Sequence, residues 1–232
     1  EPVLDIGKPG TFDDNGLNMG DIFYDGSHYR MYYVGYQIVS KVKFLAFTGL
    51  ALSSDCINFE RFSCSPVLDR SSEASYIRGI HSIYPSISGS GYDAWYSSGN
   101  DWNYINETPY PCYQTNFCHS TDGFTFPDVG LTVLSPSLPA YRLGRARYFV
   151  IQDVPHLFYT VGSQDGSYRA HISCMSENCW TSVDHDLDLS PEGFDSRHLC
   201  YAAPVRVGAS VYVFYNGNDM GRHGFGAAIL AP

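Results

Sequence analysis

The chain has 232 residues, long enough to bury one large core, and its composition favours an all-β protein. Aromatic residues make up 16% of it and charged residues only 16%, with a net charge of −10. Such an acidic chain lacks the basic patch that neutralises phosphates, and it has no run of about 18 apolar residues. We therefore expect neither nucleic-acid binding nor a membrane span.

Four similar segments organise the chain. Residues 25–35 (DGSHYRMYYVG) predict a tight Asp-Gly turn followed by an aromatic strand that ends in a glycine. The same pattern returns at residues 89–99, 152–162 and 206–217, at intervals of about 60 residues. A recurring aromatic strand at this interval is typical of a radial repeat fold.

The second half of each repeat also recurs. Residues 49–59, 115–126 and 170–180 each predict a strand, a turn of Ser or Thr with an acidic residue, and an aromatic residue that opens a further strand. One repeat is thus four antiparallel strands, which is one blade of a β-propeller. We expect a single all-β propeller domain over residues 1–232, with blades at about 19–70, 78–136, 141–190 and 197–232.

The two ends of the chain leave the number of blades open. Residues 1–5 (EPVLD) resemble residues 65–69 (SPVLD), the end of the first repeat, so they are expected to form the outer strand of a closing or preceding blade. The fourth repeat stops after its third strand. Either the ring closes with four blades, or a blade lies upstream and the propeller has five.

Cysteine usage does not decide the compartment of the protein, and localisation stays open. Seven cysteines leave at least one without an intramolecular partner. Cys174 and Cys179 flank a four-residue turn and are candidates for a disulfide, whereas Cys112 and Cys118 would lie about 20 Å apart in an extended strand. No Cys-x-x-Cys pair is present, which argues against a structural zinc site.

Several stretches, in order along nearly the whole chain, carry a resemblance to a known family. They are residues 8–16 (KPGTFDDNG), 47–51 (FTGLA), 66–70 (PVLDR), 141–145 (YRLGR), 194–196 (FDS) and 215–221 (YNGNDMG). Together they resemble the five-bladed propellers related to glycoside hydrolase families 43, 32 and 130. The nearest likeness is to an uncharacterised bacterial branch of glycosidase-like proteins that is associated with polysaccharide biosynthesis.

The resemblance has gaps that bear on activity. The WMNDPNG, RDP and EC motifs of the fructosidases are absent. The resemblance also leads us to expect a glutamate directly after Asp195-Ser196, where this chain has Arg197. If that glutamate is the general acid of the branch, this chain lacks it.

In a propeller, the loops that precede the inner strands meet at one face, so their polar residues are the candidate site. These residues are Asp13, Asp14, Asn15, Arg78, His81, Arg142, Arg145, Asp195, Arg197 and His198. Glycoside cleavage needs two carboxyl groups that flank the scissile bond. We predict Asp14 as the base and Asp195 as its partner. The plainer interpretation is that these aspartates only stabilise turns.

The other candidates would bind substrate. Arg78, Arg142, Arg145 and Arg197 suit an acidic or phosphorylated sugar, or inorganic phosphate in a phosphorolysis, unless they pair with nearby aspartates. Asp13, Asn15, His81 and His198 would donate to or accept from the same ligand. Asp101 is predicted to bind a sugar hydroxyl while Trp102 stacks on the ring.

The sequence therefore predicts a carbohydrate-active propeller, a glycoside hydrolase or phosphorylase that acts on an anionic glycoside through a pair of carboxylates. The alternative is a non-catalytic carbohydrate-binding or assembly module that has kept the fold and lost the acid. No metal site is predicted. Calcium occurs in some related propellers, but no motif in this chain indicates it, so we expect no cofactor.

Overall fold

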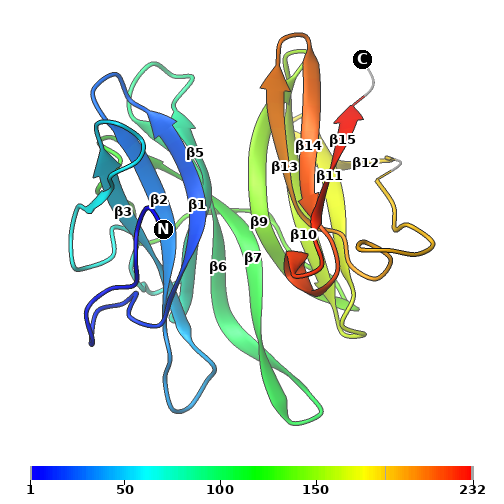
Figure 1. Cartoon of the computed structure of the whole chain (residues 1–232), viewed down its shortest axis with the longest axis horizontal. Coiled ribbons are helices and arrows are strands. Elements are labelled where there is room, and N and C mark those ends of the chain that lie inside the picture. The colour runs from blue at the N-terminus through cyan, green and yellow to red at the C-terminus, as the bar shows by residue number, and fades with distance from the viewer. Residues whose placement is uncertain (1, 186, 231–232) are drawn as a thin grey trace. The chain divides into compact units, whose positions relative to one another are not determined.

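The computed structural model describes residues 2–185 and 187–230, and in them the chain is all-β, as predicted (Figure 1). In these ranges the only other regular element is the short 3₁₀ turn η1 (Asp219–Gly221). Contacts divide the chain into two compact units, Glu1–Thr132 and Val133–Pro232. Each unit contains two groups of paired strands, and the single closed ring expected from the sequence stays a prediction.

The first unit holds the first two strand groups. They are β1 (Gly16–Tyr24), β2 (Tyr29–Gln37), β3 (Leu45–Ser53) and β4 (Glu60–Arg61), then β5 (Ile77–Pro85), β6 (Tyr92–Ile105), β7 (Thr108–Ser120) and β8 (Leu131–Leu134), whose last two residues belong to the second unit. Consecutive strands from β1 to β4 and from β5 to β7 pair antiparallel, and β8 pairs with β7. One short parallel contact, between β3 and β5, joins the two groups.

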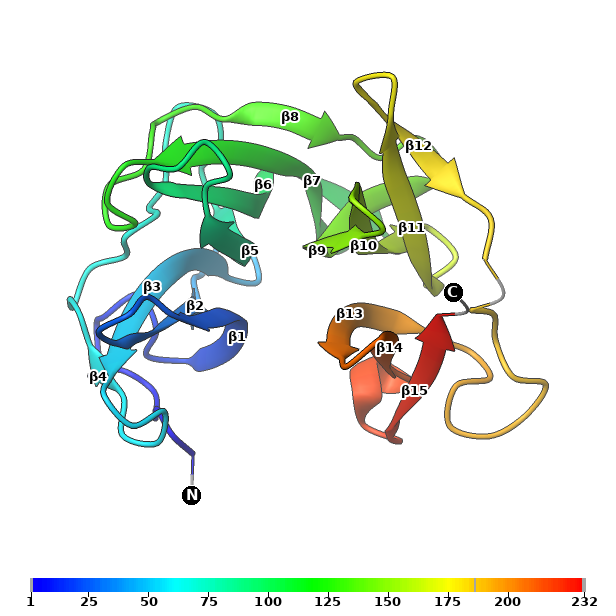
Figure 2. The same cartoon turned by 90° about the horizontal axis from the view of Figure 1, so that it is seen from above.

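The second unit holds the other two groups. They are β9 (Ala140–Ile151), β10 (Val154–Ser163), β11 (Tyr168–Ser176) and β12 (Cys179–Val183), then β13 (Cys200–Val207), β14 (Ser210–Asn216) and β15 (Phe225–Leu230). All consecutive pairs within each group are antiparallel. Figure 2 shows β13, β14 and β15 side by side as a three-stranded sheet.

In the first three repeats the aromatic doublets pack on both faces of their strands, because successive side chains of a strand point to opposite faces. In the fourth repeat Phe214 is exposed. Tyr32 lies in the core between the two strand groups of the first unit, with Ile80 and Tyr96. Its neighbour Tyr33 lies on the opposite face, in a separate cluster with Phe12. The doublet is therefore core on both sides, rather than a sugar-binding stripe.

Residues 2–5 are not part of a strand in this structure, and the outer strand predicted for residues 1–5 stays a prediction. Leu4 instead packs beside the Phe12 and Tyr33 cluster, and the backbone carbonyl of Asp5 accepts a hydrogen bond from Arg61. The Cys174–Cys179 disulfide is also absent, and all seven cysteines, which lie within the described ranges, are free thiols. In the β11–β12 hairpin Cys179 lies opposite Ser176, two positions away from Cys174, so the two thiols are out of register.

The predicted Asp-Gly hairpin is confirmed between β1 and β2, and Asp25 stabilises it. Its Oδ1 accepts hydrogen bonds from the backbone N–H groups of Ser27 and His28, at 2.9 and 2.8 Å. Its Oδ2 accepts one from Arg30 Nε at 2.5 Å. Partial burial opposes ionisation, but these donors outweigh it and lower the pKa of Asp25 to about 2.

This depressed pKa makes part of the stability sensitive to acid. Stabilisation by an acid of lowered pKa is present above its unfolded value of about 4 and is lost as the pH falls through about 2. We expect the Asp25→Asn variant to lose less stability than the wild type between these two pH values. Urea unfolding at each pH measures this, and an equal loss in both proteins would contradict it.

Candidate functional site

The loop before β1 uses its first aspartate internally. Asp13 is 1% exposed, and its Oδ2 accepts hydrogen bonds from Arg61 Nε at 2.8 Å and from the Tyr33 hydroxyl at 3.1 Å. Its Oδ1 accepts one from Thr11 at 2.8 Å. Burial and the charge of Asp13 raise the pKa of Tyr33, so the phenol stays a donor. These contacts make Asp13 a structural carboxylate and give no support to its predicted role in substrate binding.

Asp14 differs from its neighbour. Its Oδ2 accepts a hydrogen bond from the Gly10 backbone N–H at 2.7 Å, but its Oδ1 is buried and has no partner among the described residues. Buried polar groups in proteins are nearly always hydrogen-bonded, so an unpartnered carboxylate oxygen indicates a functional group or a strained one. Asn15, next in the chain, accepts from the Ile38 backbone N–H at 2.8 Å and thereby ties the β2–β3 loop to this site.

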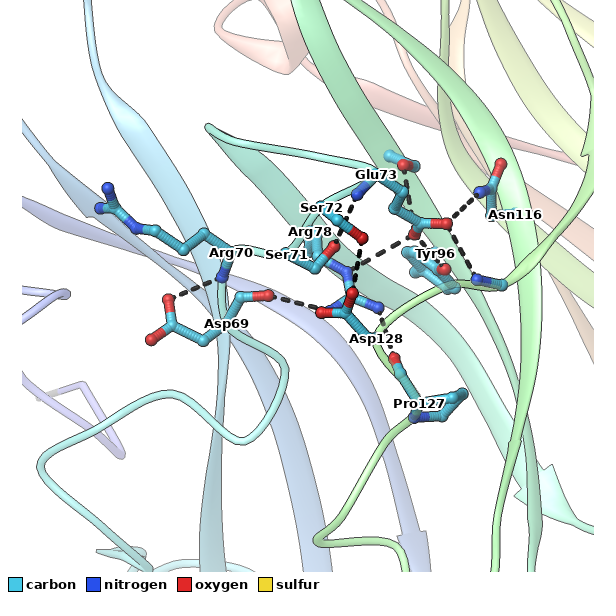
Figure 3. A network of polar contacts seen from close by, with 12 residues as sticks. Asp69, Arg70, Ser71, Ser72, Glu73, Arg78, Tyr96, Asn116, Pro127 and Asp128 are labelled. Atoms are coloured by element: carbon cyan, nitrogen blue, oxygen red, sulfur yellow. Dashed lines mark hydrogen bonds and ion pairs between the residues drawn. The ribbon is translucent and has the colours of Figure 1, made fainter.

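Glu73, in the loop before β5, is the centre of a buried polar network that the sequence did not reveal (Figure 3). Its Oε1 accepts from the Tyr96 hydroxyl at 2.5 Å, and its Oε2 accepts from the Gly130 backbone N–H at 2.8 Å and from Asn116 at 3.3 Å. The Arg78 guanidinium lies 3.6 Å from Oε1. Only the fold brings these residues together, because they come from separate segments of the chain.

Arg78 is therefore occupied by partners of its own unit. Besides Glu73, it donates to the backbone carbonyls of Asp69 and Pro127, at 3.0 and 2.8 Å, and it lies over the Tyr96 ring. Its side chain is only 4% exposed. These contacts do not support the predicted role of Arg78 in holding an anionic ligand, and they match the alternative that it pairs with an acidic residue.

Asp195 shares with Asp13 a buried position and a tyrosine partner. It is 3% exposed, and its Oδ2 accepts a hydrogen bond from the Tyr215 hydroxyl at 3.0 Å. The preceding Phe194 stacks on the Tyr215 ring with centroids 6.1 Å apart, as Phe12 stacks on Tyr33 at 6.0 Å. Within the repeat Asp195 thus corresponds to Asp13, and its hydrogen bond with Tyr215 gives no support to the predicted role as catalytic partner of Asp14, which stays a prediction.

The loops before β1 and before β13 explain two of the glycines that close the repeats, Gly35 and Gly217. A Cβ atom added to Gly35 would lie 2.5 Å from the Asp13 side chain and 2.6 Å from that of Phe12. One added to Gly217 would lie 2.3 Å from the Phe194 carbonyl oxygen. A glycine is needed because the loop before the inner strand packs directly on the backbone of the second strand.

Around Arg197 the structure brings together residues from two loops of the second unit. Asn218, which is buried, accepts hydrogen bonds from the backbone N–H groups of Arg197 and His198, at 2.8 and 2.9 Å. Arg197 Nη2 then reaches Asp219 Oδ2 at 3.1 Å, and His223 Nε2 reaches the same oxygen at 2.8 Å. The sequence identified Arg197 and His198 as candidate site residues, but not Asp219 or His223. The Asn-Gly-Asn run directly before Asp219 is typical of an ordinary turn.

The remaining two arginines contact aromatic rings. Arg142 is buried and lies over the rings of Tyr141 and Tyr168, at 4.9 and 4.8 Å. Arg145 lies 4.9 Å from the Tyr201 ring. Arg145 and Tyr201 both have a left-handed backbone, with φ of 54° and 60°, at matching irregularities of β9 and β13. Bulges of this kind turn a side chain out of the regular alternation of a strand.

Three further candidates lie in β5 and β6. His81 is buried and marks the irregularity of β5 between Ile80 and Ser82. Trp102 is half-buried against Tyr76 and Phe44, with ring centroids 4.7 and 5.9 Å apart, so it belongs to the core more than to a sugar platform. Asp101 is exposed, and its Oδ1 accepts from the Trp102 backbone N–H at 2.8 Å.

Over the described ranges, no three His, Cys, Asp or Glu side chains lie in an arrangement that would hold a metal ion. The same ranges contain no helix long and apolar enough to cross a membrane.

Comparison with known proteins relates this fold to proteins that act on glycans. No family model matches the chain. It is 26% identical over 236 residues to Rv1502, an uncharacterized protein of Mycobacterium tuberculosis, and the match covers 99% of this chain and 76% of that protein.

Solved structures give a wider view of the fold. BT0996, solved in a complex with RGII, matches with a TM-score of 0.70 at 20% identity over 97% of this chain and 72% of its own. The β-1,2-mannobiose phosphorylase of Listeria innocua matches with a TM-score of 0.67 at 14% identity, and the match covers 95% of this chain and 76% of that protein. The GH32 β-fructofuranosidase BmSUC1 of Bombyx mori matches with a TM-score of 0.61 at 13% identity, and the match covers 91% of this chain and 46% of that protein. The chain thus has the fold of glycoside hydrolase-like propellers.

Proposed function

We propose that the protein is a carbohydrate-active propeller that cleaves a glycosidic bond, with Asp14 as the base. The observation that carries this proposal is the unpartnered Oδ1 of Asp14, in the loop that leads into the first inner strand. A substrate hydroxyl or an attacking water would supply the missing donor. In a hydrolysis Asp14 would take a proton from that water, whose oxygen attacks the anomeric carbon while the bond to the leaving oxygen breaks, and the leaving oxygen would take up a proton from solvent water.

The fold supports this class of function, because proteins with this fold include a glycoside hydrolase and a phosphorylase. The preference for an anionic glycoside rests on fewer residues than the sequence suggested. Of the four predicted arginines, Arg78 and Arg142 are buried, whereas the Arg197 side chain is 63% exposed. Arg197 is therefore the residue we propose for contact with an acidic group of the ligand.

A second candidate function is a carbohydrate-binding module without turnover. The enclosed position of Asp195 favours it, because a buried carboxylate bonded to Tyr215 is poorly placed to protonate a leaving group. The two functions differ in outcome when aryl glycosides and oligosaccharides are incubated with the protein, with and without inorganic phosphate. We expect product release. Saturable binding with no product, under either condition, would favour the module.

We also propose that a further blade packs on the second unit. Register places Val205, Phe214 and Ile229 on one face of the β13–β15 sheet, and they are 43%, 40% and 62% exposed. Phe225 on the same face is also exposed. An apolar face of this kind normally marks a surface that another element covers. If a fifth blade is present, a structure that contains it is expected to have apolar side chains over Ile229, and solvent there would contradict the fifth blade.

A further inference from the structure

We propose that the loop between β2 and β3, residues 38–44, forms with the β6–β7 hairpin a surface that binds an anionic glycan through Lys41 and Lys43. We call this loop the basic loop. The inference rests on the proposed function and deepens it, because it names the charge of the glycan and the residues that hold that charge. Both elements belong to the first unit, and neither lysine is among the site residues that the sequence predicts.

The basic loop has a charge opposite to that of the chain as a whole. The chain has a net charge of −10, yet residues 26–54 contain no acidic residue. Lys41 and Lys43 are two of the three lysines of the chain, and both are exposed. Within the described part of the chain neither ammonium group has an ion-pair partner. The protein therefore leaves this positive charge available to an anion.

Strand pairing and one hydrogen bond place the basic loop beside Asp14. The start of β1 lies opposite the end of β2, where Gly16 pairs with Tyr36. The backbone N–H of Ile38 donates to Asn15 Oδ1 at 2.8 Å. The basic loop thus leaves the same end of the sheet as the loop that contains the proposed base. A glycan that contacts Asp14 has the two lysines as near neighbours.

The β6–β7 hairpin supports the basic loop through aromatic contacts. Its strands have 14 and 13 residues, against 9 in each of β2 and β3. Figure 1 shows the hairpin and the basic loop projecting in the same direction, toward the bottom of the view. Phe44 packs on Trp102 with ring centroids 5.9 Å apart, and Lys43 Nζ lies 4.1 Å from the centroid of the Tyr110 ring. An ammonium group held on a ring face in this way keeps N–H donors for a ligand.

The hairpin also offers an unused donor and an exposed ring. Asn103 pairs with Tyr110 across the hairpin, and its buried Nδ2 has no acceptor within the described ranges. Buried donors are nearly always hydrogen-bonded, so an oxygen from outside the chain is expected to accept from it. Tyr104 lies two positions after Trp102, on the same face of β6, and is 65% exposed. An exposed ring beside two ammonium groups suits a sugar that carries a negative group.

An anionic glycan fits this surface better than a nucleic acid does. Double-stranded DNA carries one charge per about 1.7 Å of its axis, and a protein that binds it neutralises several phosphates. Two lysines neutralise fewer charges than that, and the net charge of −10 repels a densely charged ligand. An oligosaccharide with a carboxylate, sulfate or phosphate group on one of its sugars matches the two ammonium groups.

The test begins with a glycan array of uronic-acid, sulfated and phosphorylated oligosaccharides and their neutral counterparts, probed with wild type and with Asp14→Asn. We expect binding to at least one acidic glycan and weaker binding to its neutral counterpart. Calorimetry at low ionic strength, where exposed charges are least screened, then measures the affinity of variants for that acidic glycan. The double variant Lys41→Gln with Lys43→Gln is expected to bind at least 10-fold more weakly at an unchanged unfolding midpoint.

Arg206→Gln is the matched control for Lys43→Gln, because each removes one exposed cation that lies over an aromatic ring. Arg206 lies over the Phe149 ring at 5.5 Å. Lys43→Gln is expected to weaken binding of the acidic glycan at least threefold, and Arg206→Gln by less than 1.5-fold. Equal losses in the two variants would mean that only the net charge of the protein matters, and would overturn the inference.

The remaining outcomes separate this inference from the proposed function. If wild type cleaves a glycoside but binds no acidic glycan, or if the double lysine variant keeps its affinity, the inference is wrong and the glycosidase proposal stands. If the double variant loses affinity but wild type cleaves no glycan, the basic loop is a binding surface of a module without turnover. Tighter binding of a thymidine oligonucleotide than of any acidic glycan would overturn the inference in favour of a nucleic acid. Neither binding nor cleavage of any glycan overturns both.

Discussion

Glu73→Ala is expected to lower the free energy of unfolding of the first unit by about 3–5 kcal/mol, the usual cost of removing one partner of a buried ion pair. The change leaves the buried Arg78 guanidinium without a counter-charge. It also removes the acceptor of the Tyr96 hydroxyl and of the Gly130 N–H group. Each buried donor that is left without an acceptor adds to the loss of stability. Urea unfolding, followed by tryptophan fluorescence, measures the effect.

The matched control for this variant is Glu60→Ala, because Glu60 is exposed in β4 and should change stability by less than about 0.5 kcal/mol. The double variant Glu73→Leu with Arg78→Met tests the mechanism. Replacing both charges by apolar groups removes the unpaired ion, so the double variant should be more stable than either single variant. A Glu73→Ala effect below about 1 kcal/mol would mean that the network is solvated and contributes little to the free energy of unfolding.

Asp14→Asn is expected to lower kcat/KM by about 1,000-fold or more, which corresponds to roughly 4 kcal/mol of lost transition-state stabilisation. An amide cannot accept the proton that the base removes, although it keeps the size of the side chain and can still accept from Gly10. The unfolding midpoint should stay close to that of the wild type. Initial rates on whichever glycoside the wild type cleaves best provide the measurement.

The adjacent Asp13 provides the control for Asp14. Asp13→Asn should lower stability, by about 2–3 kcal/mol, because its charge is paired with Arg61 in the interior. At temperatures where the Asp13→Asn variant stays folded, it should keep most of the wild-type activity. The opposite pattern, in which Asp13→Asn is inactive and stable while Asp14→Asn is active, would mean that Asp13 is the base and that Asp14 is not.

Much of the architecture could be predicted because it depends on local pattern. The Asp-Gly turn at Asp25 and the alternation of Tyr32 and Tyr33 follow from turn chemistry and from the two-residue period of a strand. The partition into two compact units and the pairing register of the cysteines depend on long-range packing. No local pattern in the sequence carries that information.

The site was less predictable because the sequence alone does not show whether a given carboxylate is buried or exposed. Asp13 and Asp14 are neighbours in sequence, yet only Asp13 meets a tyrosine and an arginine, and Arg61 lies far along the chain. Glu73 was missed for the same reason. The FDD and FDS stretches, however, contain the signal that Asp195 corresponds to Asp13, since each aspartate directly follows a phenylalanine.

The most direct test of the glycosidase proposal is mass spectrometry of an oligosaccharide library, acidic and neutral, after incubation with wild type and with Asp14→Asn. Wild type is expected to generate a new reducing end, or a sugar phosphate when phosphate is present, from at least one glycan, and Asp14→Asn is expected to generate neither. Equal product formation by both proteins, or no product and no binding by wild type, would contradict it.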